Sequence, residues 1–338
     1  MHNSVSVIIT CYNLEEYIGQ AIESVLNQDY LGAVEILVID DCSIDRSAEI
    51  IKSYGDVCYL RTEDNLGVLM ATVCGLENTL GELVFFLDGD DLWEPSKLSA
   101  LVKRFMTDPK LAFVTHDLKY IDRNGTDLHR STRPSEVMAS VPLSLEDSMT
   151  RNGVLLNSDY VWLGSAYAVH RTLGNLKEFC RFAKTLPDPF NTYQDWPLAF
   201  WVACQTSVTF GYVPLKLFRY RLHGKNHSGD ATSVPKAIRN VRRVLNTTQA
   251  MIAVLSLFKA ECIVIKVMNR KLSFCSYLDN LYNNKKLRST QGFLVSIPYL
   301  LTSPISFFKE LIRFVGIQFL GLKLFIYIAR VRESLWGT

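Results

Sequence analysis

Short apolar runs alternate with segments of helical periodicity through the first third of the chain. The apolar runs are rich in β-branched residues and occupy residues 5–10, 34–39, 57–60, 83–87 and 111–115. Between them, apolar positions recur at the spacing of amphipathic helices, over about 17–26, 43–54, 67–80 and 95–105. Strands that are apolar throughout are buried on both faces, and single helices between them indicate parallel βαβ units. The pattern predicts an α/β domain with a mostly parallel sheet.

Local polar residues suggest where these helices begin. Asn13 and Glu16 form a capping-box pattern before the first helix, and Ser43 can cap the second. Pro95 suits the first turn of the fourth helix, where a missing N–H is harmless.

Composition narrows the class of protein. Of the 338 residues, 48% are hydrophobic and 21% are charged, which excludes a disordered chain. A net charge of +2 gives no argument for nucleic-acid binding. The eight cysteines form no CxxC pair and several lie in apolar runs, so we expect reduced, buried thiols. No basic segment followed by an apolar one opens the sequence, so we predict no signal peptide and a cytoplasmic location.

The character of the sequence changes near residue 235, and we predict domains at 1–235 and 236–338. The second contains long apolar stretches, but prolines and Lys323 interrupt them, whereas a membrane-spanning helix needs about 20 apolar residues. One interpretation is a helical region lying in a membrane surface. The other is a helical lobe that packs on the first domain or on a second subunit. The basic residues behind the membrane interpretation, set against the single acid Glu310, are Lys309, Arg313, Lys323, Arg330 and Arg332.

Polar, mostly acidic residues follow three of the predicted strands. They are Thr10-Cys-Tyr-Asn13, Asp40-Asp41-Cys-Ser43 and Asp88-Gly-Asp-Asp91. Because ligands of parallel α/β sheets bind at the carboxyl ends of the strands, we expect these segments to form one site.

The run from Asp88 to Asp91 carries the clearest chemistry. On an extended segment Asp88 and Asp90 would face the same way, and Gly89 would let a ligand approach the backbone. Two carboxylates on one side suit Mg²⁺ or Mn²⁺, which also binds diphosphate oxygens. The alternative is a solvated acidic turn that caps the next helix, a structural role that we expect at least for Asp91.

Three further segments have both a functional and a structural interpretation. Asp40 and Asp41 could bind a ribose or base, or cap a helix. Asp195 precedes a helical pattern, so it could be a helix cap or, with a pKa raised by aromatic neighbours, a general base. Alternation places Arg219, Arg221 and His223 on one face of a strand end, where they could bind phosphate and metal or form an exposed basic loop.

The order and spacing of these motifs resemble family 2 of the glycosyltransferases, which have the GT-A fold, a Rossmann-like and mostly parallel sheet with flanking helices. The resemblance covers about residues 3–230. It rests on residues 7–18, 35–45, 65–67 and 86–91, on Gln194-Asp195, and on Tyr220-Arg-Leu-His223.

The resemblance implies a role for each residue. Asp195 would be the catalytic base, although Gln194 stands where the family has Glu. Asp40, with Asp41 beside it, would read the base of the donor, and Asp88 would bind its ribose or the metal. The metal ligands would be Asp90, His223 and Asp88. The nucleotide-sugar site would comprise Thr10, Tyr12, Asn13, Asp40, Asp41, Asn65, Asp88, Arg219 and Arg221.

The implied activity is inverting transfer of a sugar from a nucleoside-diphosphate sugar, with a UDP-sugar favoured, to an acceptor hydroxyl. Mn²⁺ or Mg²⁺ would be the cofactor. The acceptor would be a glycan or a lipid-linked intermediate of cell-envelope polysaccharide assembly, met at the inner face of the cell membrane. Acceptor contacts are expected from residues 116–195, including Trp162-Leu-Gly-Ser165. Nothing in the sequence indicates nucleic acid as a partner or fixes an oligomeric state.

Other classes fit less well. A catalytically inactive nucleotide-sugar-binding module is favoured only by Gln194, and Asp195 argues against it. A dehydrogenase needs a glycine-rich turn after the first strand, where this chain has Thr10-Cys-Tyr-Asn13. A phosphatase with a DxD nucleophile would carry it on the first strand. A nucleotidyltransferase would have a glycine-rich loop with basic residues near its N-terminus.

Overall fold

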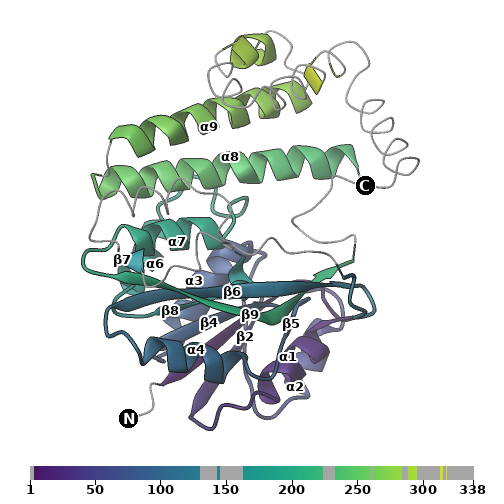
Figure 1. Cartoon of the computed structure of the whole chain (residues 1–338). Coiled ribbons are helices and arrows are strands. Elements are labelled where there is room, and N and C mark those ends of the chain that lie inside the picture. Colours follow the sequence, from purple (N-terminus) through teal and green to yellow (C-terminus); the bar gives the residue numbers. More distant parts are fainter. Residues whose placement is uncertain are drawn as a thin grey trace. The chain divides into compact units, whose positions relative to one another are not determined.

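The chain divides into two compact units, Met1–His223 and Gly224–Thr338 (Figure 1). The computed structural model describes residues 4–129, 143–144, 163–223, 233–259, 262–283, 288–294, 313–314 and 317.

Within these described residues, one nine-stranded sheet forms the centre of the first unit. Its strands are β1 Val5–Cys11, β2 Val34–Asp40, β3 Cys58–Arg61, β4 Leu83–Asp88, β5 Leu92–Trp93, β6 Leu111–Asp122, β7 Leu143–Ser144, β8 Tyr167–His170 and β9 Thr209–Leu222. The helices are α1 Ile18–Leu26, α2 Ser47–Lys52, α3 Val68–Glu77, α4 Lys97–Phe105, α6 Leu176–Ala183 and α7 Asp195–Ala203, with a short 3₁₀ helix, η1, at Gly164–Ala166. The predicted α/β architecture is confirmed.

The order of the strands explains where a site can form. The sheet runs β3-β2-β1-β4-β8-β6-β9-β5, and β1 is parallel to both β2 and β4. The chain leaves β1 toward β2 and β3, then returns through α3 to β4 on the other side of β1. Such a reversal opens a crevice outside the carboxyl ends of the strands. The sequence pattern did not predict β8, which pairs antiparallel with β4 and β6.

Helices cover both faces of this sheet (Figure 1). Val5, Val7 and Ile9 of β1 belong to a core that also contains apolar residues of α1, α2 and α4. Ile8 points to the other face, where it meets Gly75 of α3 so closely that a Cβ on Gly75 would lie 2.4 Å from it. Burial on both faces is why these strands are continuous apolar runs rather than alternating ones.

The three predicted helix starts are wrong. Asn13 has a left-handed backbone with φ 54°, and its Oδ1 accepts a hydrogen bond from Ile44 N at 2.8 Å. Ser43 Oγ accepts from Asn13 N at 3.0 Å instead of capping α2. Pro95 precedes Ser96, the N-cap residue of α4. Asn13 and Ser43 join the loop after β1 to the loop after β2, so they are not available as caps.

The second unit is helical in its described residues. Helix α8, Val234–Leu257, begins after Ser233, whose Oγ accepts a hydrogen bond from Lys236 N at 3.4 Å. It packs against α9, Cys262–Tyr282. Tyr277 and Leu281 of α9 form a small core with Phe293 and Ile317. Among the described residues, no helix is long and apolar enough to cross a membrane. Most of the basic residues behind the surface-helix interpretation, between 309 and 332, lie outside the described part.

Candidate active site

The acidic run after β4 is a tight turn. Asp91 N donates a hydrogen bond to Asp88 O at 2.9 Å, so residues 88–91 are not the extended segment predicted from alternation. Gly89 also has a different role from the predicted one. A Cβ on Gly89 would lie 2.9 Å from the carbonyl oxygen of Thr10, so the glycine lets β1 and the turn approach each other. The turn therefore directs neighbouring carboxylates to different partners.

Asp90 is paired with a histidine. Its Oδ2 lies 2.8 Å from His223 Nε2, and the His223 side chain is almost completely buried. Tyr17 packs against the imidazole with ring centroids 4.7 Å apart. The structure thus brings together two of the predicted metal ligands, which are 133 positions apart in the sequence.

Asp88 lies at the end of β4, where three side chains hydrogen-bond to it. Its Oδ1 accepts hydrogen bonds from Gln194 Nε2 at 3.1 Å and Thr10 Oγ1 at 3.3 Å. Its backbone N–H donates to Ser165 Oγ at 3.0 Å. Burial, and then the charge of Asp90, raise the pKa of Asp88 to about 7. A nearby cation would favour the ionised form, so this carboxylate is suited to a ligand that brings positive charge.

Asp91 is buried and anchors the turn. Its Oδ1 accepts from Arg221 N at 2.9 Å, and its Oδ2 accepts from Ser165 Oγ at 2.8 Å. Burial and the neighbouring carboxylates raise its pKa well above the usual value. The carboxylate joins the turn to β9 and η1 and does not cap α4, whose N-cap is Ser96.

The two arginines of β9 have different partners. Arg221 donates through Nε to Asp90 O at 2.8 Å and through Nη2 to Gln20 Oε1 at 2.9 Å. It therefore stabilises the acidic turn through a backbone carbonyl of that turn. Arg219 forms a bidentate pair with Glu94, at 2.8 and 3.2 Å. The structure therefore joins Arg221 and His223 to Asp90, and joins Arg219 to Glu94.

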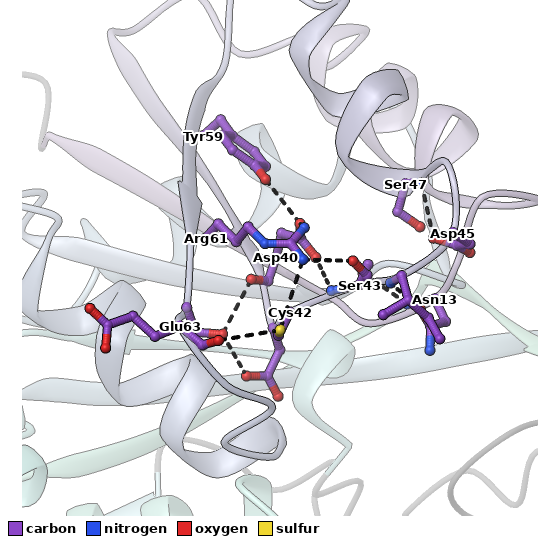
Figure 2. Close-up of polar contacts among 12 residues, drawn as sticks. Asn13, Asp40, Cys42, Ser43, Asp45, Ser47, Tyr59, Arg61 and Glu63 are labelled. Carbon is purple, nitrogen blue, oxygen red and sulfur yellow. Dashed lines mark hydrogen bonds and ion pairs between the residues drawn. The ribbon is translucent and has the colours of Figure 1, made fainter.

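Asp40 is fully buried at the end of β2 (Figure 2). Its Oδ1 accepts from Ser43 N at 2.8 Å, and its Oδ2 accepts from Tyr59 Oη and Arg61 Nη1, each at 2.9 Å. Arg61 also donates to Ser43 O at 2.8 Å. Sequence reasoning missed Tyr59 and Arg61. Because β3 ends at Arg61, beside Asp40 in the parallel register, the rule for strand ends could have found Arg61.

Asp41 fixes the loop that leads into α3. Its Oδ1 accepts from Leu66 N at 2.8 Å, and its Oδ2 accepts from Gly67 N at 2.8 Å. Asn65 Oδ1 shares the Gly67 N–H, at 3.1 Å. Gly67 has φ 81°, a backbone conformation that favours glycine. In this structure, Asp40 and Asp41 hydrogen-bond to the loops that would surround the base of a bound nucleotide.

Asp195 is the first residue of α7, after the N-cap residue Gln194. Its Oδ1 accepts a hydrogen bond from Trp196 N at 3.0 Å. Burial, and then the charge of Asp88, raise the pKa of Asp195 to about 7. A carboxylate with a pKa near neutrality is suited to accept a proton at physiological pH. The charge of Asp88 thus acts on the Asp195 carboxylate.

The remaining predicted contacts are at the edge of the site. Thr10 contacts Asp88, Asn13 joins the two loops, and Tyr12 is half-buried. Ser165, predicted only as an acceptor contact, is buried and binds both Asp88 and Asp91. Trp162 lies outside the described residues.

The ligand set fits a divalent ion that is completed by substrate. Within the described part of the chain, no group of three or more His, Cys, Asp or Glu side chains could hold a metal by itself. Asp90 and His223 are nevertheless in contact, with the Asp88 charge nearby. Carboxylate plus imidazole suits Mn²⁺, and two protein ligands leave positions for diphosphate oxygens.

Comparison with known proteins identifies the family of one part of the chain. The profile of glycosyl transferase family 2 matches residues 6–172, which include β1, β2, β4 and the acidic turn. Residues 6–172 are a glycosyl transferase family 2 domain. Over 135 residues the chain is 34% identical to the UDP-Glc:alpha-D-GlcNAc-diphosphoundecaprenol beta-1,3-glucosyltransferase WfaP of Escherichia coli, covering 39% of this chain and 53% of that protein. The chain spans about half the length of the curated relatives it matches.

Solved structures confirm the GT-A fold. S. aureus TarS in complex with UDP-GlcNAc superposes with a TM-score of 0.55 at 16% identity, covering 88% of this chain and 91% of that one. The mannosyltransferase PcManGT from Pyrobaculum calidifontis, in complex with GDP-Man and Mn²⁺, superposes with a TM-score of 0.53 at 16% identity, covering 100% of this chain and 88% of that one.

Proposed function

We propose that this protein transfers a sugar from a nucleoside-diphosphate sugar to an acceptor hydroxyl, with inversion at the anomeric carbon. The observation that carries the proposal is the arrangement of Asp195 with a pKa near neutrality beside Asp88, which lies in the same acidic turn as the Asp90–His223 pair. A base and a diphosphate site on one sheet edge are the two parts that a single in-line displacement requires.

Residues of this chain account for each step of the proposed reaction. Ionised Asp195 takes the proton of the acceptor hydroxyl, and that oxygen attacks the anomeric carbon while the bond to the diphosphate breaks. Attack on the face opposite the leaving group inverts the configuration. Asp90 and His223 would hold a divalent ion, with Asp88 beside it. When bound, such an ion supplies charge neutralisation at the leaving nucleoside diphosphate. Asp91 and Arg221 keep the turn in place throughout.

For the donor, a UDP-sugar is the favoured choice. The relative WfaP carries UDP-Glc in its name, and TarS was solved with UDP-GlcNAc. PcManGT was solved with GDP-Man, so the fold also accommodates a purine donor. A panel of UDP- and GDP-sugars, scored for hydrolysis with Mn²⁺, tests the proposal. We expect Mn²⁺-dependent release of UDP from one UDP-sugar, and a panel without any nucleotide release or binding would contradict it.

We also propose a lipid-linked acceptor of cell-envelope glycan assembly, met at the inner face of the membrane. WfaP is named for a diphosphoundecaprenol acceptor. The charge of the chain is unevenly distributed: residues 236–338 contain sixteen of the 36 Lys and Arg residues but four of the 34 Asp and Glu residues. In the described part, α8 carries Arg239 and Arg242 on exposed positions, and α9 carries Lys266 and Arg270. A strongly basic unit is attracted to an anionic lipid surface.

Binding to vesicles tests the membrane contact. The whole protein should co-sediment with vesicles that contain anionic phosphatidylglycerol and should bind at least about tenfold more weakly to neutral phosphatidylcholine vesicles, since each basic residue near the surface contributes about 1 kcal/mol. Raising the salt should release it. Replacing Arg239 and Lys266 by Gln should weaken binding, while Lys103→Gln on α4 in the first unit serves as the control. Equal binding to both vesicle types would contradict the proposal.

A further inference from the structure

Gln194, where the sequence departs from the family pattern, connects three elements of the site. It is 5% exposed and directly precedes the proposed base. Its Nε2 donates to Asp88 Oδ1 at 3.1 Å, and its Oε1 accepts from Thr72 Oγ1 of α3. One side chain therefore links the start of α7 to the end of β4 and to α3.

The amide lies against η1. A Cβ on Gly164 of η1 would lie 2.5 Å from Gln194 Nε2, so the amide occupies the space beside this glycine. The next residue, Ser165, accepts the backbone N–H of Asp88. Asp88 is thus held from two directions, by η1 through its backbone and by Gln194 through its carboxylate.

The chemistry of the amide matches these partners. An amide has a donor end and an acceptor end, and here the donor end faces a carboxylate while the acceptor end faces a hydroxyl. A Glu at this position would place an oxygen where the amide nitrogen now lies, about 3 Å from Asp88. Like charges at that distance repel and would move the Asp88 carboxylate or force a shared proton.

We propose that Gln194 is a positioning residue, whose neutral amide fixes the Asp88 carboxylate of the donor site relative to Asp195. It acts through Asp88 and does not touch substrate. The inference rests on the proposed function, because it assigns the donor to Asp88 and proton removal to Asp195. The proposal also explains why this chain has Gln at position 194. The contact with Asp88 needs a hydrogen-bond donor, which an ionised carboxylate does not supply.

The order of two variants tests the proposal. Gln194→Glu is nearly the same size as the native residue, whereas Gln194→Ala removes the bridge without adding charge. We expect Gln194→Glu to weaken UDP binding in the presence of Mn²⁺, measured by calorimetry, by about tenfold or more, the equivalent of one pKa unit of interaction. Gln194→Ala should weaken UDP binding less than Gln194→Glu does. A merely packing role predicts the reverse order, and that order would overturn the proposal.

A control and a polarity swap complete the experiment. Gln205→Glu makes the same change of charge just beyond the end of α7, where Nε2 donates to Trp201 O, and it should leave UDP binding unchanged. In the double variant Asp88→Asn with Gln194→Glu, the donor and acceptor exchange places. We expect Gln194→Glu to lower the melting temperature and the double variant to restore it. A double variant no more stable than Gln194→Glu, or one that still fails to fold when the single variant does, would overturn the proposal. Wild-type protein that binds no nucleotide would instead overturn the proposed function and this inference with it.

Discussion

Replacing Asp195 by Asn should reduce turnover by about 10²–10⁴-fold, the contribution that a positioned general base makes, while leaving UDP binding intact. Asn keeps the size of the side chain and its contact with Trp196 N but cannot accept the proton of an acceptor hydroxyl. Initial rates and calorimetry with UDP and Mn²⁺ measure the two effects separately. Asp188→Asn, which alters a carboxylate bound to Asn191 in the preceding loop, is the matched control and should retain activity.

The raised pKa of Asp195 also predicts how activity and stability depend on pH. Because burial and Asp88 raise this pKa to about 7, wild-type kcat/KM should fall as the pH falls through about 7. In Asp195→Asn the decline should be shallower, and what is left of it comes from Asp88, whose pKa is also raised to about 7. A folded-state pKa above the unfolded value also means that stability is lost as the pH rises from about 4 to about 7. Asp195→Asn should therefore be at least as stable as wild type at pH 8. Normal turnover, or a variant that loses activity because it unfolds, would contradict the assignment.

Replacing Asp90 by Asn should abolish the dependence on Mn²⁺ together with most of the activity. Charge stabilisation by a bound metal contributes several kcal/mol, so we expect a loss of at least about a hundredfold. Asn can keep the hydrogen bond to His223 but is a much weaker ligand. Activity assays across Mn²⁺ concentrations, and UDP binding with and without Mn²⁺, separate loss of the ion from loss of the fold.

Two further variants and a chelator control make the test of the metal site specific. Glu94→Gln removes a carboxylate that lies near the same turn but is paired with Arg219 and Lys119, so it should leave the Mn²⁺ dependence unchanged. His223→Gln should resemble Asp90→Asn. Full activity of wild type in excess chelator would remove Asp90 and His223 from their proposed roles.

The sequence predicted much of the sheet because strand burial leaves a local signal. All five predicted strands exist, and the three polar segments lie at the carboxyl ends of β1, β2 and β4. The helix caps were predicted wrongly because a polar residue near a helix start has several possible partners. Asn13 binds Ile44 N, 31 positions away, a contact that no local pattern encodes.

From the sequence alone we predicted the βαβ order and the sheet edge at which the polar segments gather, and we named Asp195 as a candidate base with a helix cap as the alternative. The partners of each carboxylate became visible only in the folded chain. Asp91 binds Ser165 and Arg221, 74 and 130 positions away, and is buried as an anchor, whereas Asp90 meets His223. The physical reason is that periodicity reports burial along one element, while a hydrogen bond or a pKa depends on donors and charges from distant segments. The acidic turn was visible in the sequence, and its division of roles was not.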